Sequence, residues 1–208
     1  MKKVFIVKPL TKVIISEIII TIKGKSQDGG FMRVIAGIAR SRKLITLDTN
    51  DVRPTVERTK EAMFSAIQFE IEGRRVLDLF AGSGQLGIEA LSRGAESATF
   101  VDNNKKSIEV VRKNLETVGF TEKSKVINTQ AEVFVKATDE KFHIAFVDPP
   151  YAKGILQKIL PEVEKCMADG GIIICEYPYG EEIPEEIGRF KNRRVYKYSK
   201  VSVAIYRE

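Results

Sequence analysis

Four consecutive residues, Asp148-Pro149-Pro150-Tyr151, place an acid, two prolines and an aromatic ring directly after the apolar run 142–147. Two successive prolines fix φ and remove two N–H donors, so the turn is stiff and its carbonyls remain acceptors. An amino group on a nucleic-acid base is a weak nucleophile because its lone pair is delocalised into the ring. Hydrogen bonds from its protons to the Asp148 carboxylate and the Pro149 carbonyl would favour a pyramidal nitrogen, while Tyr151 stacks on an extruded base. The four residues therefore predict a catalytic site for methylation of an exocyclic amino group, with a plain proline turn as the alternative.

A second candidate site lies at residues 76–87, which combine an apolar strand, a glycine-rich turn and a helix start. Gly82 and Gly84 let the backbone turn tightly and a ligand approach closely. Asp78 precedes the turn, where a carboxylate suits the ammonium or sulfonium of S-adenosylmethionine better than a pyrophosphate. Asp102 ends the next expected strand, where a carboxylate can hold ribose hydroxyls or cap a helix. The predicted cofactor-binding residues are Asp78, Phe80, Gly82, Ser83, Gly84, Asp102, Ala131 and Glu132.

The elements expected around these motifs alternate strand and helix after Gly73, which is typical of a parallel sheet covered by helices. The expected strands are residues 75–80, 98–101, 125–128, 144–147, 171–176, 193–198 and 201–206, and the expected helices are 85–93, 105–118, 131–137 and 154–167. The last two strands are nearly adjacent in sequence and should pair antiparallel. We therefore expect an α/β, Rossmann-like class I methyltransferase fold with a mostly parallel seven-stranded sheet and an antiparallel last strand.

Positive charge is concentrated ahead of this sheet. Residues 1–53 hold 11 Lys and Arg against 4 Asp and Glu, and the rest of the chain is about neutral. Two β-like segments, 34–36 and 44–47, flank the basic turn Arg40-Ser41-Arg42-Lys43 and predict a small N-terminal β-hairpin. A second basic cluster occupies residues 189–200. Such clusters favour a nucleic-acid partner because phosphate contacts release counterions, with a merely solvated surface as the alternative.

The remaining N-terminal sequence predicts three parts. Arg53-Pro54-Thr55 suits a helix start, and apolar residues from Ala62 to Phe69 recur at roughly helical spacing. The apolar region before residue 31 is interrupted by charges and does not fit a secretory signal. The expected division is an extension of unknown role over 1–31, a basic RNA-binding hairpin over 32–52, and a catalytic domain over 53–208.

Composition excludes several classes of protein. Hydrophobic residues make up 43% and charged residues 30% of the chain, which is typical of a globular protein. No run approaches the roughly 18 apolar residues of a membrane span. Cys166 and Cys175 lack metal-ligand spacing, so we expect free thiols, no metal and a cytoplasmic location. We also expect a monomer. His143 opens an apolar run, which favours a structural role.

Taken together, these motifs resemble the RsmD family of bacterial 16S ribosomal RNA guanine-N2 methyltransferases over about residues 32–208. The resemblance rests on Arg33-Val34-Ile35-Ala36-Gly37, Arg42-Lys43-Leu44, Arg53-Pro54-Thr55 with Arg58 and Glu61, and residues 78–84, 87–94 and 146–151. The motif Asp-Pro-Pro-Tyr alone is shared by many amino-methylating enzymes. Its combination with the basic hairpin and the Arg-Pro-Thr element narrows the resemblance to this family.

The resemblance implies S-adenosylmethionine as cofactor, S-adenosylhomocysteine as product and 16S ribosomal RNA in an assembling small subunit as partner. The implied reaction is transfer to the N2 amino group of a guanine, of the type at position 966. The substrate-binding residues implied are Arg40, Arg42 and Lys43, which would hold RNA, and Arg53, Thr55 and Arg58, in a region that would cover the cofactor and target pocket. A surface charge pair of Arg58 with Glu61 is the alternative for that part of the helix. The motifs alone leave open an adenine-N6 methyltransferase acting on DNA or RNA, a non-catalytic nucleic-acid-binding protein and, last, a nicotinamide dehydrogenase.

Overall fold

The computed structural model describes residues 31–47, 54–150, 154–198 and 200–208, except for the side chains of residues 31 and 54–57. Predictions for residues 1–30, Arg53 and Tyr151 lie outside the described residues. The strands are β1 (Phe31–Arg33), β2 (Lys43–Ile45), β3 (Arg75–Leu79), β4 (Ser97–Asp102), β5 (Ser124–Asn128), β6 (Phe142–Val147), β7 (Met167–Pro178), β8 (Asn192–Lys197) and β9 (Val201–Arg207). The helices are α2 (Pro54–Ala66), α3 (Gln85–Ser92), α4 (Lys105–Val118), the 3-10 turn η2 (Thr121–Lys123), α5 (Ala131–Ala137) and α6 (Ile155–Lys165).

The large sheet has the strand order β5-β4-β3-β6-β7-β9-β8, and β1 pairs with β2 in a separate hairpin. The five strands from β5 to β7 in this order run parallel, while β9 is antiparallel to both β7 and β8. The predicted fold class is therefore confirmed, including the closing antiparallel pair.

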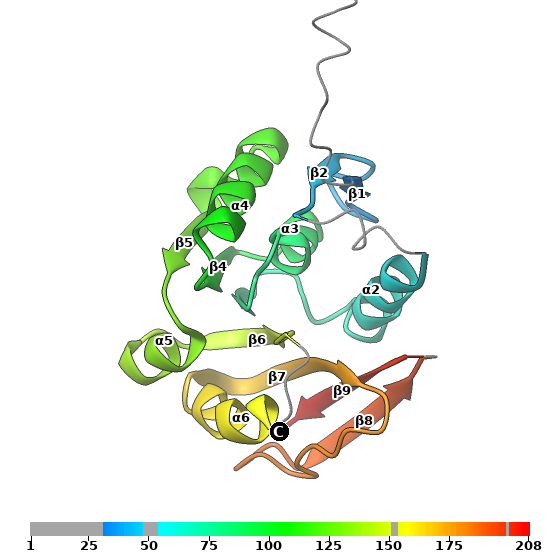
Figure 1. Ribbon diagram of the computed structural model, residues 1–208, viewed down its shortest axis with the longest axis vertical. Coiled ribbons are helices and arrows are strands. Elements are labelled where there is room, and N and C mark those ends of the chain that lie inside the picture. The colour runs from blue at the N-terminus through cyan, green and yellow to red at the C-terminus, as the bar shows by residue number, and fades with distance from the viewer. Residues whose placement is uncertain (1–30, 48–53, 151–153, 199) are drawn as a thin grey trace, which may run out of the picture.

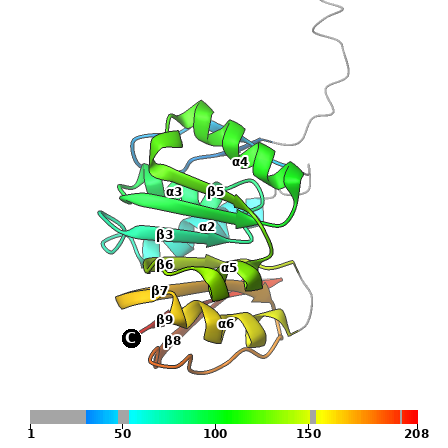
Figure 2. The same ribbon diagram turned by 90° about the vertical axis from the view of Figure 1, so that its left-hand side faces the viewer.

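Helices cover both faces of the sheet, so the domain has three layers (Figures 1 and 2). Strand residues alternate between the two faces. Val76 of β3 and Phe146 of β6 pack with α2, α3 and α4, whereas Leu77 and Val147 pack with α5 and α6. Because both faces are buried, the central strands are apolar at nearly every position, and this pattern made them recognisable in the sequence.

The carboxyl ends of β3 and β6 meet where the strand order reverses. From β3 the chain moves outward through β4 to β5, and it then returns to place β6 on the other side of β3. Such a reversal opens a crevice at the carboxyl edge of the sheet, where open α/β folds bind ligands. Leu79 pairs with Val147, so the glycine-rich turn after β3 lies beside Asp148. The two motifs identified in the sequence thus meet at one edge.

The N-terminal hairpin differs from its prediction. Its strands are β1 and β2, and residues 34–36 form no strand. The carboxylate of Glu89 in α3 is fully buried and accepts hydrogen bonds from the amides of Ile35 (2.8 Å) and Ala36 (3.0 Å). These amides are satisfied by a helix side chain instead of a partner strand. The prediction of a strand at 34–36 was wrong because this partner lies more than 50 residues further along the chain.

The hairpin packs closely on the rest of the domain. Val34, Ala39 and Leu44 are buried in the same hydrophobic cluster as β3 and α3. The buried charge of Glu89 is balanced by Arg93, whose Nε lies 2.9 Å away, and by Lys60 of α2, whose Nζ lies 3.5 Å away. Such a buried charge must be paired and hydrogen-bonded to be tolerated. Glu89 therefore connects the hairpin, α2 and α3.

Helix α2 begins at Pro54, as predicted, but ends before Phe69. Phe69 was predicted on the apolar face of this helix, yet it follows the helix and its side chain is 93% exposed. Arg207 of β9 donates to the Ala66 carbonyl (3.2 Å) and to Glu70 (2.8 Å), which satisfies a carbonyl of the last turn. The helix therefore stops where a distant strand supplies a donor, a contact that helical periodicity does not encode.

Gly87 is required where α3 approaches the sheet. A Cβ atom at this position would lie 2.3 Å from the Phe100 ring and 3.2 Å from Oδ2 of Asp78. We expect Gly87→Ala to lower the free energy of unfolding by about 1–3 kcal/mol through overpacking, measured by urea denaturation. In a Phe100→Leu background the same substitution should cost less, because the flat ring is gone. Equal costs in both backgrounds would show that the clash is not the cause.

Candidate active site

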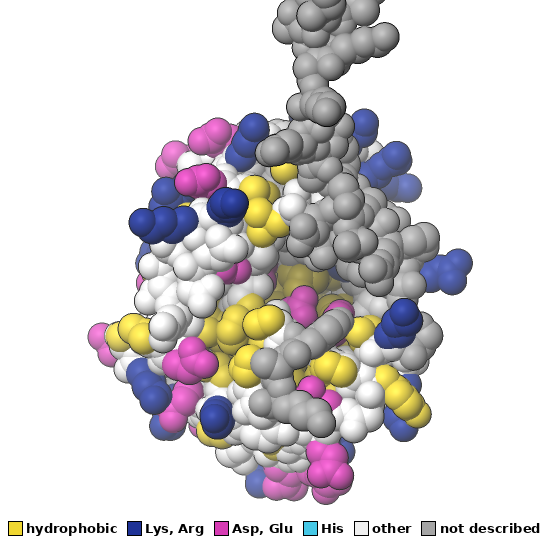
Figure 3. Space-filling view, viewed as in Figure 1, with side chains coloured by type: hydrophobic (Ala, Val, Ile, Leu, Met, Phe, Trp, Pro, Cys, Tyr) yellow, Lys and Arg dark blue, Asp and Glu magenta, His cyan; other side chains and the backbone are white. Residues whose placement is uncertain are grey.

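A cavity of about 660 Å³ lies at the carboxyl edge of the sheet, between the glycine-rich turn and the end of β6. Ten of the predicted site residues line it: Asp78, Phe80, Gly82, Ser83, Asp102, Ala131, Glu132, Asp148, Pro149 and Pro150. This face of the molecule is hollowed near its middle, where hydrophobic and acidic side chains gather (Figure 3). The structure thus brings the predicted cofactor residues and the Asp-Pro-Pro segment into one space.

Among the described residues predicted to bind the cofactor or to act in catalysis, Gly84 is the one that does not line the cavity. Gly84 precedes α3 as its N-cap with a φ of 78°, and it packs near Val111 and Phe100. Gly84 therefore contacts the core side of the glycine-rich turn and not the cavity. Tyr151 falls outside the described residues, so its predicted stacking on the base remains a prediction.

The turn after β3 holds an unusual backbone conformation. Phe80 has a φ of 69°, although it carries a large side chain, and Gly82 has a φ of 55°. A non-glycine residue in this region is strained and is maintained only when its surroundings enforce it. The enforcing contacts are hydrogen bonds from the Ala81 amide to the Val101 carbonyl (2.9 Å) and from the Gly82 amide to Asp102 (2.9 Å). All four residues of this turn, from Phe80 to Ser83, line the cavity.

Asp78 is a buried carboxylate at the floor of this cavity. Its Oδ2 accepts a hydrogen bond from the Gly87 amide (2.9 Å) at the start of α3. Burial raises the pKa of Asp78 to about 7, against the effect of this hydrogen bond and with a further increase from Asp102. A carboxylate that is costly to ionise when alone is stabilised by a cationic partner. Asp78 is therefore well suited to receive the positively charged end of a ligand.

Asp102 at the end of β4 uses both carboxylate oxygens to organise the neighbouring backbone. Oδ2 accepts from the Gly82 amide and Oδ1 accepts from the Asn104 amide (2.8 Å). Asn104 is the N-cap of α4, because its side chain accepts from the Lys106 amide (2.9 Å). The alternative role of Asp102 as the cap itself is thus wrong. Each oxygen retains a further lone pair with which it can accept a hydrogen bond from a ribose hydroxyl.

Asn114 of α4 ties the hairpin to the glycine-rich turn, a role that the sequence did not indicate. Its amide exchanges two hydrogen bonds with the backbone of Ile45 in β2, at 2.8 and 2.9 Å. The same Nδ2 donates to the Ser83 carbonyl at 2.9 Å. The side chain is fully buried. A polar residue on the buried face of a predicted helix was the available signal, and only the fold shows what it joins.

The Asp148 segment follows β6 without interruption. Val147 pairs with Cys175 of β7, so Asp148 stands beside Glu176, and both carboxylates line the cavity. Asp148 is half-buried, Pro149 is buried and Pro150 is exposed. Glu176 was missed in the sequence, where it is one polar residue at the end of an apolar run. The carboxyl edge therefore carries Glu176 in addition to the predicted acids Asp78, Asp102 and Asp148.

The two basic clusters differ in how far acidic neighbours neutralise their charges. Arg40, Arg42 and Lys43 are exposed on the hairpin turn, and Arg58 is exposed on α2. Thr55 lies in the first turn of α2, and its side chain is outside the described part. The basic cluster at 189–200 is partly neutralised by acids. Arg189 donates hydrogen bonds to Asp169 (2.8 Å) and to two backbone carbonyls. Lys191 forms an ion pair with Glu186, and Arg193 forms one with Glu185 (3.6 Å). The hairpin is therefore the better candidate for contact with nucleic acid.

The cysteines and the histidine lie away from this chemistry. Cys166 and Cys175 are free and buried, as predicted, and burial raises the pKa of the Cys175 thiol to about 12. His143 lies in β6 near its amino end and accepts from the Arg75 amide (3.2 Å). Across the described ranges, no three His, Cys, Asp or Glu side chains are arranged to hold a metal ion. None of the helices in those ranges is both long and apolar enough to cross a membrane.

Comparison with known proteins connects this site to a family. The family described as Conserved hypothetical protein 95 matches residues 32–207. The Bacillus subtilis protein YlbH, named as an rRNA methyltransferase, is 38% identical over 182 residues, covering 85% of this chain and 99% of the relative. Ribosomal RNA small subunit methyltransferase D of Escherichia coli is 34% identical over 164 residues, 78% of this chain and 82% of the relative. The chain belongs to the RsmD family.

A solved structure agrees with this assignment. The Escherichia coli protein yhhF, named as a methyltransferase, superimposes with a TM-score of 0.76 at 31% identity, covering 86% of this chain and 98% of that protein. S-adenosylmethionine, predicted from the residues of the glycine-rich turn, is the cofactor of this RsmD-family protein. The cavity fits such a molecule, because its volume lies within the usual range for small-ligand sites and the acids Asp78 and Asp102 line it.

Proposed function

We propose that this RsmD-family protein methylates the N2 amino group of a guanine in 16S ribosomal RNA, of the type at position 966, within an assembling small subunit. The observation that carries the proposal is the position of Asp148 and Pro149, at the carboxyl end of β6 and on the wall of the cofactor cavity. The names of the relatives, ribosomal RNA small subunit methyltransferase D, support the RNA substrate.

The residues of the chain have distinct roles in this reaction. Asp78 would hold the ammonium of the cofactor and Asp102 its ribose, while the turn at Gly82 admits the ligand close to the backbone. When bound, the sulfonium supplies an activated methyl group. Asp148 and the Pro149 carbonyl would accept the two protons of the amino group and point its lone pair at the methyl carbon. The main contribution of the protein is this alignment, which can account for a large share of a rate enhancement.

The atoms balance in a single displacement. The guanine N2, held by Asp148 and the Pro149 carbonyl, would take the methyl group that the bound S-adenosylmethionine supplies, and the electron pair of the broken carbon–sulfur bond would leave with the sulfur. The alkylated nitrogen then releases one proton to the Asp148 carboxylate, which passes it to water. The products are N2-methylguanine and S-adenosylhomocysteine.

A labelling experiment tests the proposal. Small subunits from a strain that lacks the gene are incubated with the protein and labelled S-adenosylmethionine, and duplex DNA is the parallel substrate. We expect label at one guanine of 16S RNA, mapped by primer extension and identified by mass spectrometry as N2-methylguanine. Label in N6-methyladenine, or only in DNA, would contradict the proposal.

The hairpin should supply RNA affinity through its charges. We expect Arg40→Ala with Arg42→Ala to reduce the slope of log affinity against log salt by about 1.4 to 1.8, because each lost phosphate contact removes about 0.7 to 0.9. Filter binding to small-subunit RNA between 50 and 200 mM salt measures this. The matched control replaces Lys136 and Lys158, two exposed lysines on the helices of the other face. A slope equal to that of the control would exclude the hairpin as the RNA contact.

A further inference from the structure

Glu176 and Asp148 form a pair of carboxylates at the ends of two adjacent strands. The parallel register of Val147 with Cys175 brings the next residue of each strand side by side. Both acids are half-buried and both line the cavity that also contains Pro149. Adjacent strands lie about 4.8 Å apart, so the two side chains can contact neighbouring atoms of one ligand.

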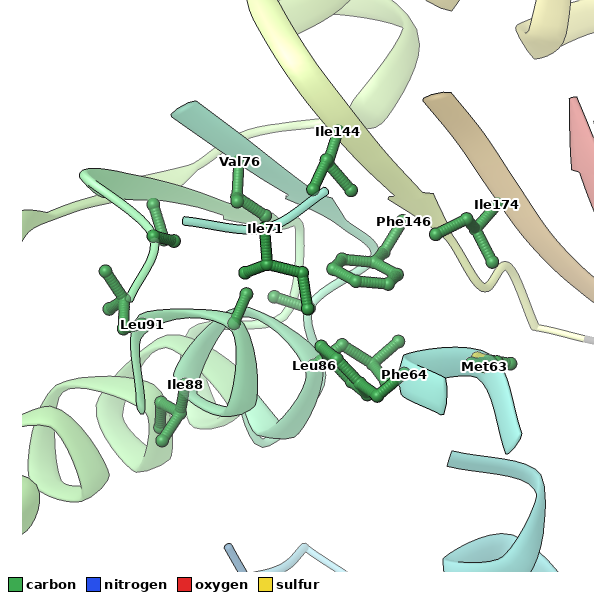
Figure 4. Close-up of a cluster of buried hydrophobic side chains, with 14 of the residues drawn as sticks. Met63, Phe64, Ile71, Val76, Leu86, Ile88, Leu91, Ile144, Phe146 and Ile174 are labelled. Atoms are coloured by element: carbon green, nitrogen blue, oxygen red, sulfur yellow. The ribbon is translucent and has the colours of Figure 1, made fainter. Parts of the chain in front are cut away.

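The two acids also face the same side of the sheet. Two residues earlier, Phe146 and Ile174 project from β6 and β7 toward Met63 and Phe64 of α2 (Figure 4). The Phe64 and Phe146 rings are 5.3 Å apart. Because side chains alternate along a strand, Glu176 of β7 lies on this face, as does Asp78 of β3, and Asp148 is the next position of this alternation, directly after β6 ends at Val147. Both acids therefore lie at the carboxyl edge of the sheet, on the face that α2 covers.

Two neighbouring acids that accept hydrogen bonds favour a ligand edge with two adjacent donors. Among bases that carry an exocyclic amino group, guanine places the N1–H donor beside its N2 amino group. Adenine and cytosine place a ring nitrogen with a lone pair beside theirs. A carboxylate next to Asp148 thus accepts a hydrogen bond from guanine, and it is repelled by the corresponding atom of adenine or cytosine.

We propose that Glu176 accepts the N1–H hydrogen bond of the target guanine and so determines the choice of guanine over adenine. This assignment rests on the proposed function and extends it. The amino protons go to Asp148 and the Pro149 carbonyl, and the ring N–H goes to Glu176. A site built to bind a donor rejects the analogue that lacks it, since its own polar group is left unpaired.

The test changes only the ring nitrogen of the target. Small subunits are reconstituted with 16S RNA that carries guanine, 2-aminopurine or adenine at the mapped position. 2-Aminopurine keeps the amino group at C2 but has a lone pair at N1. For the wild-type protein we expect kcat/KM on 2-aminopurine to be at least about 100-fold below that on guanine.

Substitution of Glu176 should change this ratio. In Glu176→Gln the uncharged amide oxygen is a weaker acceptor than a carboxylate, so activity on guanine should fall roughly 10- to 150-fold. The amide nitrogen can donate to the ring nitrogen of 2-aminopurine, so the preference for guanine over 2-aminopurine should shrink to about 10-fold or less. Glu176→Ala should also lose the preference. Glu122→Gln is the matched control, because this exposed acid lies in η2, ahead of β5 and away from the carboxyl edge, and should leave the ratio unchanged.

Three outcomes separate the possibilities. Equal use of guanine and 2-aminopurine by the wild-type protein, or a ratio that Glu176→Gln leaves intact, would overturn the role of Glu176 while the proposed function stands. Absence of methylation on guanine-containing subunits would overturn the proposed function and this assignment together. Binding of S-adenosylhomocysteine to each variant, measured by calorimetry, shows whether the cavity is still folded, and a structural role alone would not alter the base preference.

Discussion

Asp148→Ala is expected to lower kcat for methyl transfer by about 10²- to 10⁴-fold, the usual range for removing a positioned proton acceptor. Asp148 lies on the wall of the cavity, directly after β6 and beside the rigid Pro149. Without its carboxylate, the amino nitrogen loses the acceptor that orients its lone pair and that receives its proton. Asp148→Asn should be intermediate, because an amide oxygen can still accept one hydrogen bond.

Single-turnover transfer of labelled methyl groups to small subunits measures this effect. Affinity for S-adenosylhomocysteine should change little, since the cofactor is assigned mainly to Asp78 and Asp102. Asp139→Ala is the matched control: this acid is exposed and lies before β6, away from the carboxyl edge. Full turnover by Asp148→Ala would show that the chemistry lies elsewhere in the cavity.

The second large effect concerns Asp78 and pH. Burial raises the pKa of this carboxyl to about 7 in the free protein, so at pH 6 it is mostly protonated. A ligand ammonium requires the ionised form, and binding must then release a proton. Affinity for S-adenosylhomocysteine should therefore fall by about tenfold for each pH unit below 7. Asp78→Asn should bind weakly and without this pH dependence.

Calorimetry at pH 6 in two buffers of different ionisation enthalpy measures the released proton directly. The same carboxyl affects stability, with the sign set by its raised pKa. Because the folded state holds the proton more tightly than the unfolded chain, whose pKa is near 3.8, the contribution of Asp78 is greatest below pH 4 and is lost as the pH rises to about 7. An affinity that stays constant from pH 5.5 to 7.5 would exclude Asp78 as the partner of the ammonium.

The sequence by itself determined the sheet, the glycine-rich turn and the Asp148 segment. Strands buried on both faces are continuous apolar runs, and α4 was predicted with the observed bounds, Lys105–Val118, because its apolar face repeats at helical spacing. Asp78, Asp102 and Asp148 could be singled out for a related reason. Each is an acid in or directly after an apolar strand, and the carboxyl ends of parallel strands share one edge.

Only the tertiary structure decided how distant residues complete these elements. The amides at 35 and 36 bind the Glu89 carboxylate, so the expected strand at 34–36 does not form. Asn114 connects the hairpin to the glycine-rich turn by hydrogen bonds. Glu176 became the neighbour of Asp148 through the register of β6 and β7. Each of these is a polar side chain whose partner lies far away in sequence. Local patterns record whether a residue is buried, because periodicity reflects burial, but the partner of a buried polar group depends on which elements pack together.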